Sequence, residues 1–200
     1  MFLACLHKAT AFNSVSAPKQ MISPVEPKVR MEWIELEPGL KVYRCPKSQG
    51  YWIPESAYWK WTSTRPQRLE PLPADAGFDV EEEPGQPVRI CPETGKLMTR
   101  YRVGKGFSFR IDRSPNGGIW LDAGEWEALK SRNFHDALLS VFTASWQKAI
   151  VKSEQAQSLT DQFRRRIGED EFERVTEFKS WLKRQQDPEA ILCFLQDDAL

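Results

Sequence analysis

Hydrophobic positions follow two different spacings along the chain, and the change between them divides the sequence. In the run Phe107-Ser108-Phe109-Arg110-Ile111, apolar and polar side chains alternate, and Gly104-Lys105-Gly106 precedes it. Alternation is typical of a strand with one buried face, so residues 89–113 are predicted to form a β-hairpin. From about Asn133 onward apolar residues instead recur every three or four positions, which predicts helices.

The C-terminal region, 132–200, is therefore expected to be helical. One face of a long first helix carries a repeated set of apolar side chains: Leu139, Phe142, Trp146 and Ile150. Gly168 ends this helix, a second helix covers 169–184, and Asp187-Pro188 begins a third. We expect a helical hairpin that buries one apolar stripe. The same stripe of the long helix could instead form a homodimer.

The N-terminal part divides by composition. Residues 1–30 are rich in Ser, Pro, Ala and Lys and lack periodicity, so we expect a disordered tail. Residues 31–62 form a compact segment rich in aromatic side chains. Residues 63–88 are rich in proline and include the acidic run 79–83, which is typical of a linker or a long extended loop.

Composition limits the classes of function. Lys plus Arg equals Asp plus Glu at 28 each in 200 residues, so bulk charge favours neither nucleic acid nor an acidic partner. The four cysteines, Cys5, Cys45, Cys91 and Cys193, are far apart in the chain. No stretch has the character of a signal peptide or a membrane span. We therefore expect a cytoplasmic protein with reduced thiols.

Two stretches of the chain, 45–54 and 113–122, have a similar pattern. Each has a glycine two positions before a tryptophan, Trp52 or Trp120, and an aliphatic residue directly after it. Each also leads into a segment with helical character that carries another tryptophan. This pattern predicts an internal repeat.

The second copy resembles the bacterial zinc-ribbon family named after the zinc finger of transcription factor IIB. That family has a Cys-Pro-x-Cys knuckle, a β-hairpin, a second Cys-Pro-x-Cys followed by Gly-Gly-x-Trp-Leu-Asp, and a short helix. Here Cys91-Pro92-Glu93-Thr94-Gly95 matches the first knuckle, and the run 117–125 matches the end of the second. The resemblance implies an α+β fold: two small ribbon-like modules, 31–62 and 89–131, before the helical region.

The same resemblance shows that most metal ligands are missing. Its four ligand positions hold Cys91, Thr94, Arg113 and Asn116, and the shorter first copy retains Cys45 with Ser48 in the partner position. Structural zinc needs four sulfur or nitrogen ligands, and Arg113 is a permanent cation. We therefore expect no cofactor, and a ribbon held together by tryptophan packing. Zinc would bind only with ligands from elsewhere in the chain.

The predicted hairpin carries a local group of cations interleaved with aromatic residues. Candidate contacts for nucleic acid or an acidic partner are Lys96, Arg100, Arg102, Lys105 and Arg110. The alternative is a solvated polar face above a buried aromatic one.

No catalytic arrangement is recognisable in the sequence. The two histidines are far apart, and the glycine-containing runs lack the ending of a phosphate-binding loop. The sequence therefore predicts a non-enzymatic adaptor or assembly factor with an unknown protein partner. The alternative functions are a nucleic-acid-binding accessory protein and a ribbon that binds zinc.

Overall fold

The structure is a computed structural model, and it describes residues 20–65, 68–82 and 85–196. The fold is α+β, as predicted, and the chain divides into two compact units, Met1–Thr143 and Ala144–Leu200. The first unit contains a six-stranded sheet, and the second is helical. Among the helices of the described residues, none combines the length and apolar content that crossing a membrane requires.

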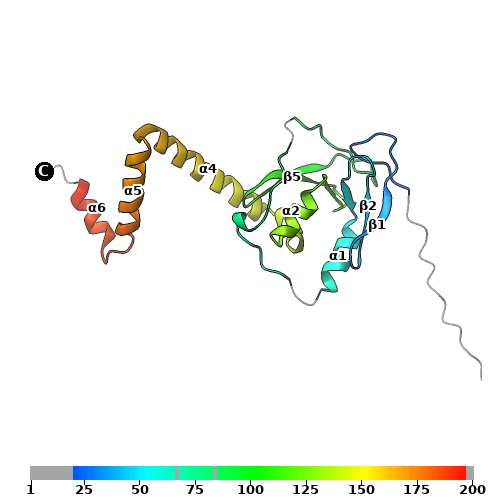
Figure 1. The fold of residues 1–200 in the computed structure, drawn as a ribbon, viewed down its shortest axis with the longest axis horizontal. Coiled ribbons are helices and arrows are strands. Elements are labelled where there is room, and N and C mark those ends of the chain that lie inside the picture. Colours follow the sequence, from blue (N-terminus) through cyan, green and yellow to red (C-terminus); the bar gives the residue numbers. More distant parts are fainter. Residues whose placement is uncertain (1–19, 66–67, 83–84, 197–200) are drawn as a thin grey trace, which may run out of the picture. The chain divides into compact units, whose positions relative to one another are not determined.

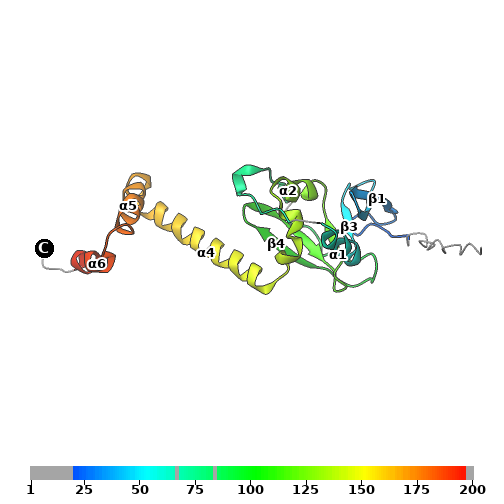
Figure 2. The same ribbon diagram turned by 90° about the horizontal axis from the view of Figure 1, so that it is seen from below.

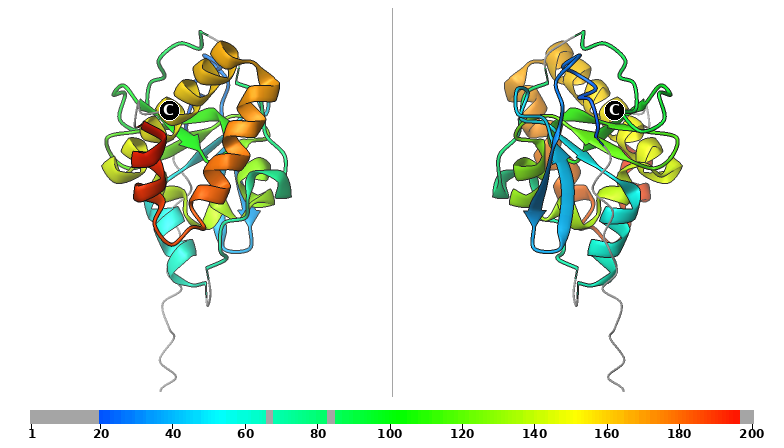
Figure 3. Two further views of the ribbon diagram at one scale, coloured as in Figure 1. Left: turned by 90° about the vertical axis from the view of Figure 1, so that its left-hand side faces the viewer. Right: turned by 90° about the vertical axis from the view of Figure 1, so that its right-hand side faces the viewer.

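The sheet is antiparallel throughout and has the strand order β1-β2-β3-β6-β5-β4. Its strands are β1 (Glu32–Glu37), β2 (Leu40–Arg44), β3 (Tyr51–Ile53), β4 (Thr99–Gly104), β5 (Phe107–Arg113) and β6 (Ile119–Leu121). The β4–β5 pair is the hairpin predicted from the alternating pattern, and β1–β2 forms the other long hairpin, blue in the right-hand view of Figure 3.

The sheet consists of two equivalent halves. Strands β1, β2 and β3 are followed by α1 (Glu55–Ser63), and β4, β5 and β6 are followed by α2 (Glu125–Ser131) (Figure 1). The halves meet where β3 pairs with β6, and Trp52 lies directly opposite Trp120 in that pair. The two stretches that resemble each other in sequence therefore lie side by side, related by an approximate twofold axis.

The junction between the halves depends on two glycines. A Cβ atom added at Gly50 would overlap the ring of Trp120, and one added at Gly118 would overlap the ring of Trp52. Both tryptophan side chains are completely buried. Each half thus supplies one indole ring and one glycine surface that receives the other ring, which explains why glycine stands two positions before each tryptophan.

The two helices of the first unit enclose a second group of aromatic side chains. The ring of Trp61 on α1 lies 5.9 Å from that of Trp126 on α2 and 5.9 Å from that of His135. The buried hydroxyl group of Tyr58 donates a hydrogen bond to the backbone carbonyl of His135 at 2.7 Å and accepts one from the Leu138 N–H at 3.2 Å. These contacts fix α1 against the segment that follows α2.

Residues 20–30 were predicted to belong to a disordered tail, but in the structure they form a hydrogen-bonded loop. Ile22 and Arg30 form an antiparallel bridge, Met31 N–H donates to the carbonyl of Met21, and both methionines are buried. Proline and serine, which suggested disorder, are here residues of a tight loop. Residues 1–19, with Cys5, lie outside the described residues.

The segment predicted as a linker packs against the second half of the sheet. It includes η1 (Ala74–Ala76). The backbone N–H of Leu72 donates to the carbonyl of Arg132, and the carboxylate of Asp79 accepts from the N–H of Ser108, both at 2.9 Å. Proline here limits the conformations of an extended segment that contacts its neighbours, so the described part of 63–88 does not act as a spacer.

The helical region begins later than the periodicity predicted. Asn133 has a positive φ of 62°, and η2 (Phe134–Asp136) and α3 (Leu138–Val141) follow as short turns of the first unit. The second unit contains α4 (Ala144–Ile167), α5 (Glu169–Leu182) and α6 (Pro188–Gln196), shown from below in Figure 2. Gly168, with φ of 89°, separates α4 from α5 as predicted.

Replacing Gly50 or Gly118 by alanine is expected to destabilise the first unit. The added methyl group would overlap a buried indole ring, and relieving this overlap costs roughly 2 kcal/mol or more. Chemical denaturation followed by tryptophan fluorescence measures the free energy of unfolding. Gly95→Asn is the matched control, because an added Cβ meets nothing within 4 Å there and asparagine tolerates its positive φ. Equal effects of Gly50→Ala and the control would contradict this account of the junction.

Candidate functional site

Four loops of one construction flank the central strands. They are loops L1 (23–29), L2 (45–50), L3 (91–96) and L4 (114–118), and each begins with serine or cysteine followed by proline. In each, the N–H of the first residue donates to the carbonyl of the last, at 2.8 to 2.9 Å. The residue before that carbonyl always has a positive φ: Lys28, Gln49, Gly95 or Gly117. The loops differ in length but share this closure.

In the first half, L1 and L2 meet around Cys45. Its side chain is completely buried, and its sulfur accepts a hydrogen bond from the N–H of Ser48 at 3.4 Å. Burial raises the pKa of the Cys45 thiol, but hydrogen bonds from the hydroxyl groups of Ser23 and Ser48 and from nearby backbone N–H groups outweigh burial and lower it. The predicted positions Cys45 and Ser48 are therefore brought together, with Ser23 as an unpredicted third member.

In the second half, L3 and L4 meet around Cys91. The buried thiol donates to Asn116 Oδ1 at 3.8 Å, and Asn116 Nδ2 donates to Glu93 at 2.6 Å. Glu93 also accepts from the indole nitrogen of Trp52 at 3.0 Å, so the first half is hydrogen-bonded to a loop of the second. Thr94 Oγ1 remains within L3 and accepts a hydrogen bond from the Lys96 N–H at 3.4 Å.

Ser114, and not Arg113, occupies the position in L4 that Cys45 occupies in L2. Its N–H closes the loop, and proline follows it, as in the other three loops. Its buried hydroxyl has no hydrogen-bond partner among the described residues. Arg113 belongs to β5, and its guanidinium group contacts the carboxylate of Glu55 at 3.3 Å and the ring of Phe142 at 4.7 Å. The shorter length of L4 shifted the sequence alignment by one residue.

The residues between the loops do not match the requirements of structural zinc. Within residues 20–65, 68–82 and 85–196, no three His, Cys, Asp or Glu side chains are grouped so that they could hold a metal ion. Each half offers one thiol beside hydroxyl or amide oxygens, and Ser114 and Asn116 are neutral oxygen donors. Structural zinc takes four thiolate or imidazole ligands, so these residues do not fit that ion.

The cations of the β4–β5 hairpin are largely engaged within the molecule. Arg100 pairs with Asp112 at 3.1 Å and Glu82 at 3.5 Å, and Arg110 lies 3.8 Å from the same Glu82. Arg102 and Lys105 also have interaction partners. Lys96, in L3, is exposed. The predicted basic surface is therefore partly covered by acidic side chains of the preceding segment.

A buried ionic cluster in the second half was not found from the sequence. The guanidinium group of Arg89 contacts the carboxylates of Asp112 at 2.5 Å and Asp122 at 2.7 Å, and Asp122 also accepts from the Trp120 indole nitrogen at 2.9 Å. Asp112 and Asp122 lie 23 and 33 positions after Arg89 in the sequence, so no local pattern could have revealed the cluster. It attaches the segment before L3 to the sheet.

Glu125 begins α2 beside this cluster. Its carboxylate accepts from the N–H of Asp122 at 2.7 Å, whereas the carboxylate of Asp122 contacts Arg89 and not the helix. Burial raises the pKa of Glu125 well above its ordinary range, and the nearby carboxylate of Asp122 adds to that effect. The cation of Arg89 acts in the opposite direction.

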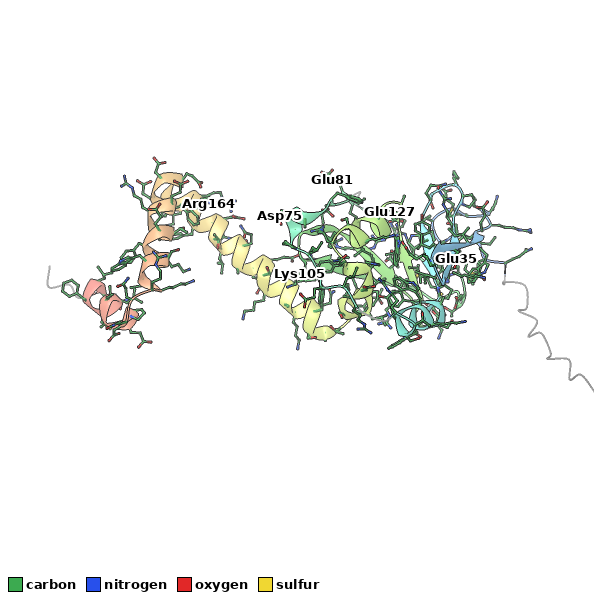
Figure 4. All side chains as sticks on the ribbon, turned by 60° about the horizontal axis from the view of Figure 1, so that its bottom comes forward. Glu35, Asp75, Glu81, Lys105, Glu127 and Arg164 are labelled. Carbon is green, nitrogen blue, oxygen red and sulfur yellow. The ribbon has the colours of Figure 1, made fainter. Side chains whose placement is uncertain are left out.

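The second unit has a different character, because most of its large apolar side chains are exposed. Ile150 and Leu182 are the buried apolar side chains among its described residues. α4 and α5 meet at Gly168, where the ring of Phe163 lies 6.5 Å from that of Phe172 and Arg164 contacts Phe172 and Glu169. Figure 4 shows side chains projecting from these helices, with Arg164 labelled near the end of α4. Of the predicted apolar stripe, Phe142 and Ile150 are buried and Leu139 and Trp146 are half-buried, whereas the other large apolar side chains of this unit are mostly exposed. Its exposed large apolar residues are Val151, Leu159, Phe163, Val175, Phe178, Trp181, Leu192, Phe194 and Leu195.

Comparison of this chain with protein-family models, with curated proteins and with solved structures finds no match.

Glu125→Gln is expected to make the free energy of unfolding less dependent on pH. The unfolded glutamate ionises near pH 4.3, whereas the folded carboxyl retains its proton to higher pH. The stability that the protonated side chain contributes is thus present below pH 4.3 and lost as pH rises through the folded pKa. The amide introduced by this substitution could still accept from the Asp122 N–H but does not ionise.

Urea unfolding of both chains between about pH 4 and pH 8 tests this expectation. The stability of Glu125→Gln relative to the unsubstituted chain should increase with pH. If the free energies of unfolding of the two chains change in parallel with pH, Glu125 has the same pKa in the folded and the unfolded state, which would contradict this expectation. Glu127→Gln is the control, since Glu127 is exposed on the same helix.

Proposed function

We propose that this protein is a non-enzymatic adaptor that binds a protein partner through α6. The observation that supports this proposal is the exposure of apolar side chains throughout the second unit, where Ile150 and Leu182 alone are buried among the described apolar residues. Ordering a helix costs conformational entropy, and helices of this length gain most of their stability by packing an apolar face. Such a unit has surface available for a partner.

α6 is the helix best suited to this role. Its apolar residues Ile191, Leu192, Phe194 and Leu195 lie on one side of the helix, because each has another member of the set three or four positions away. Phe194 is 65% exposed, Leu195 55% and Leu192 43%. An amphipathic helix with this spacing is what a hydrophobic groove on another protein recognises. The partner is therefore expected to present an apolar groove.

The first unit serves, in this proposal, as a metal-free scaffold of two degenerate zinc-ribbon halves. The four loops support this interpretation, because each begins with Ser-Pro or Cys-Pro and closes through the same hydrogen bond. Tryptophan packing at the β3–β6 junction, the Arg89 cluster and the Cys45 hydrogen bonds would replace the stabilisation that zinc supplies in such a module.

The alternative function, nucleic-acid binding through the basic β4–β5 hairpin, has weaker support than the adaptor function. Arg100 and Arg110 share the carboxylate of Glu82, and Arg113 pairs with Glu55. Phosphate binding would have to displace these carboxylates before the cations could contribute. The exposed apolar helices favour a protein partner, so we place the adaptor function first.

Substituting Leu192 and Phe194 by aspartate is expected to abolish partner binding without unfolding the first unit. Affinity capture with the full chain, followed by measurement of stoichiometry, compares this variant with the unsubstituted protein. Glu189→Gln, an exposed polar change on the same helix, is the matched control and should retain the partner. Capture of the same stoichiometric partner by the aspartate variant would exclude α6 as the binding face.

Restoring thiols between L1 and L2 tests the ribbon interpretation. In the triple variant Ser23→Cys, Glu26→Cys, Ser48→Cys, the added thiols join the native Cys45 around one centre, and we expect one zinc ion per chain. Bound metal should raise the thermal midpoint, and elemental analysis gives the stoichiometry. The same variant with Cys45→Ser should bind zinc more weakly. Failure of the triple variant to bind zinc while remaining folded would argue against an ancestral metal site.

A further inference from the structure

The imidazole ring of His135 is buried inside the first unit and held in place there. Its side chain is 5% exposed. The ring packs against the indole rings of Trp61 on α1 and Trp126 on α2, with centroids 5.9 Å and 5.7 Å away. The backbone carbonyl of His135 accepts from the hydroxyl group of Tyr58 at 2.7 Å. Because the ring is fixed, a change in its charge must be accommodated by the groups around it.

The two nitrogen atoms of this ring have different surroundings. The guanidinium Nη1 of Arg65 lies 3.4 Å from Nε2, within hydrogen-bond distance. A guanidinium group can only donate, so Nε2 must supply the lone pair and the proton of the neutral ring belongs on Nδ1. Nδ1 is buried without a hydrogen-bond partner among the described residues. The contact with Arg65 therefore specifies a neutral imidazole.

Arg65 and His135 lie beside one carboxylate, that of Asp136. Arg65 forms an ion pair with Asp136 Oδ1, and His135 Nε2 lies 3.7 Å from the same oxygen. The other oxygen, Oδ2, accepts from the backbone N–H of Leu69 at 3.0 Å. The side chain of Asp136 is 2% exposed, whereas that of Arg65 is 25% exposed. Arg65 is thus the member of this group that can move into solvent.

From this geometry we propose that protonation of His135 transfers the carboxylate of Asp136 from Arg65 to His135. A proton on Nε2 would point at the guanidinium group, so two donors and two positive charges would face each other. Asp136 Oδ1 can accept this proton after a small movement toward the ring. That movement releases Arg65 and weakens the hydrogen bond from Leu69, so the segment that follows α1 is held less firmly in acid.

The charges that face His135 set the pH at which this exchange occurs. Burial has the largest effect and lowers the pKa of His135, and the cations of Arg65 and, from α2, Lys130 lower it further. The carboxylates of Asp136 and, from β1, Glu37 act in the opposite direction. The stability that the neutral ring contributes is present above the pKa of unfolded histidine, about 6.5, and is lost as pH falls through the folded pKa. The exchange is therefore expected below about pH 6.5.

The exchange concerns the first unit alone, so this inference goes beyond the proposed adaptor function, which uses α6. Mild acid would loosen the attachment of Arg65 and Leu69 while the sheet and its central junction remain folded. One part of the first unit would then have an order that depends on pH, as in proteins that use histidine as a pH sensor.

NMR titration of the imidazole groups in the purified full chain tests the exchange of charge. The chain has two histidines, His7 and His135, and the signal absent from His135→Gln belongs to His135. This signal should titrate with a midpoint below about 6.5. Arg65→Gln removes the competing cation and should raise the midpoint by roughly half a unit or more, since Asp136 is then free to pair with His135. Arg68→Gln, an equal charge change at an exposed position, is the control and should leave the midpoint unchanged.

Amide hydrogen exchange measures the second consequence, the weaker hydrogen bond from Leu69. Each rate is divided by the rate of the same amide in His135→Gln at the same pH, because intrinsic exchange also varies with pH. The ratio for Leu69 should be close to unity at about pH 7.5 and roughly tenfold higher at about pH 5. The N–H of Leu72, which donates to the carbonyl of Arg132, is the matched control and should keep a constant ratio.

A midpoint at or above about 6.5, or one that Arg65→Gln leaves unchanged, would overturn the proposal. A ratio for Leu69 that does not depend on pH would do the same. If His135→Gln does not fold, the Arg65→Gln and Arg68→Gln titrations still decide, because both chains retain the histidine, and His7→Gln then assigns the signals.

Discussion

The structure of the first unit depends on one reciprocal contact, in which the indole ring of each half lies against a glycine of the other. The contact requires Gly50 and Gly118 to lack side chains, since a single methyl group at either position would overlap a buried ring. It also fixes the register of β3 against β6, because Trp52 and Trp120 must stand opposite each other. That register sets how the two halves of the sheet, each with its own hairpin, helix and pair of loops, lie against each other.

Around this junction, several weaker interactions hold the four loops in place. Hydroxyl groups contact the Cys45 thiol, Glu93 joins L3 to Trp52, and Arg89 neutralises two carboxylates. The attraction between paired buried charges offsets the cost of removing them from water, so a buried ion pair adds little net stability by itself. The contribution of these groups is to specify one arrangement of the loops, while aromatic burial supplies most of the free energy.

The sequence predicted the features that depend on neighbouring residues, but not those that join positions far apart in the chain. The β4–β5 hairpin, the Gly168 break and the similarity of the stretches around Trp52 and Trp120 have local patterns and were predicted. The Arg89–Asp112–Asp122 cluster and the aromatic group around His135 join distant positions and were not. Residues 20–30 and the described part of 63–88 were misread because proline suggests disorder and ordered loops alike. Ser114 was missed because L4 is shorter than L2 and L3, although the Ser-Pro that begins L1 and L4 was a usable signal.

The symmetry of the junction also bears on how such a chain could arise. Each half contributes the same two elements, a glycine and a tryptophan two positions later, and receives the same two from the other. A single half with this pair would be complementary to a copy of itself. Duplication followed by fusion would convert such a dimer into one chain without changing the contact. Each copy would then be free to change its loops independently: cysteine begins L2 of one half and L3 of the other, and serine begins L1 and L4.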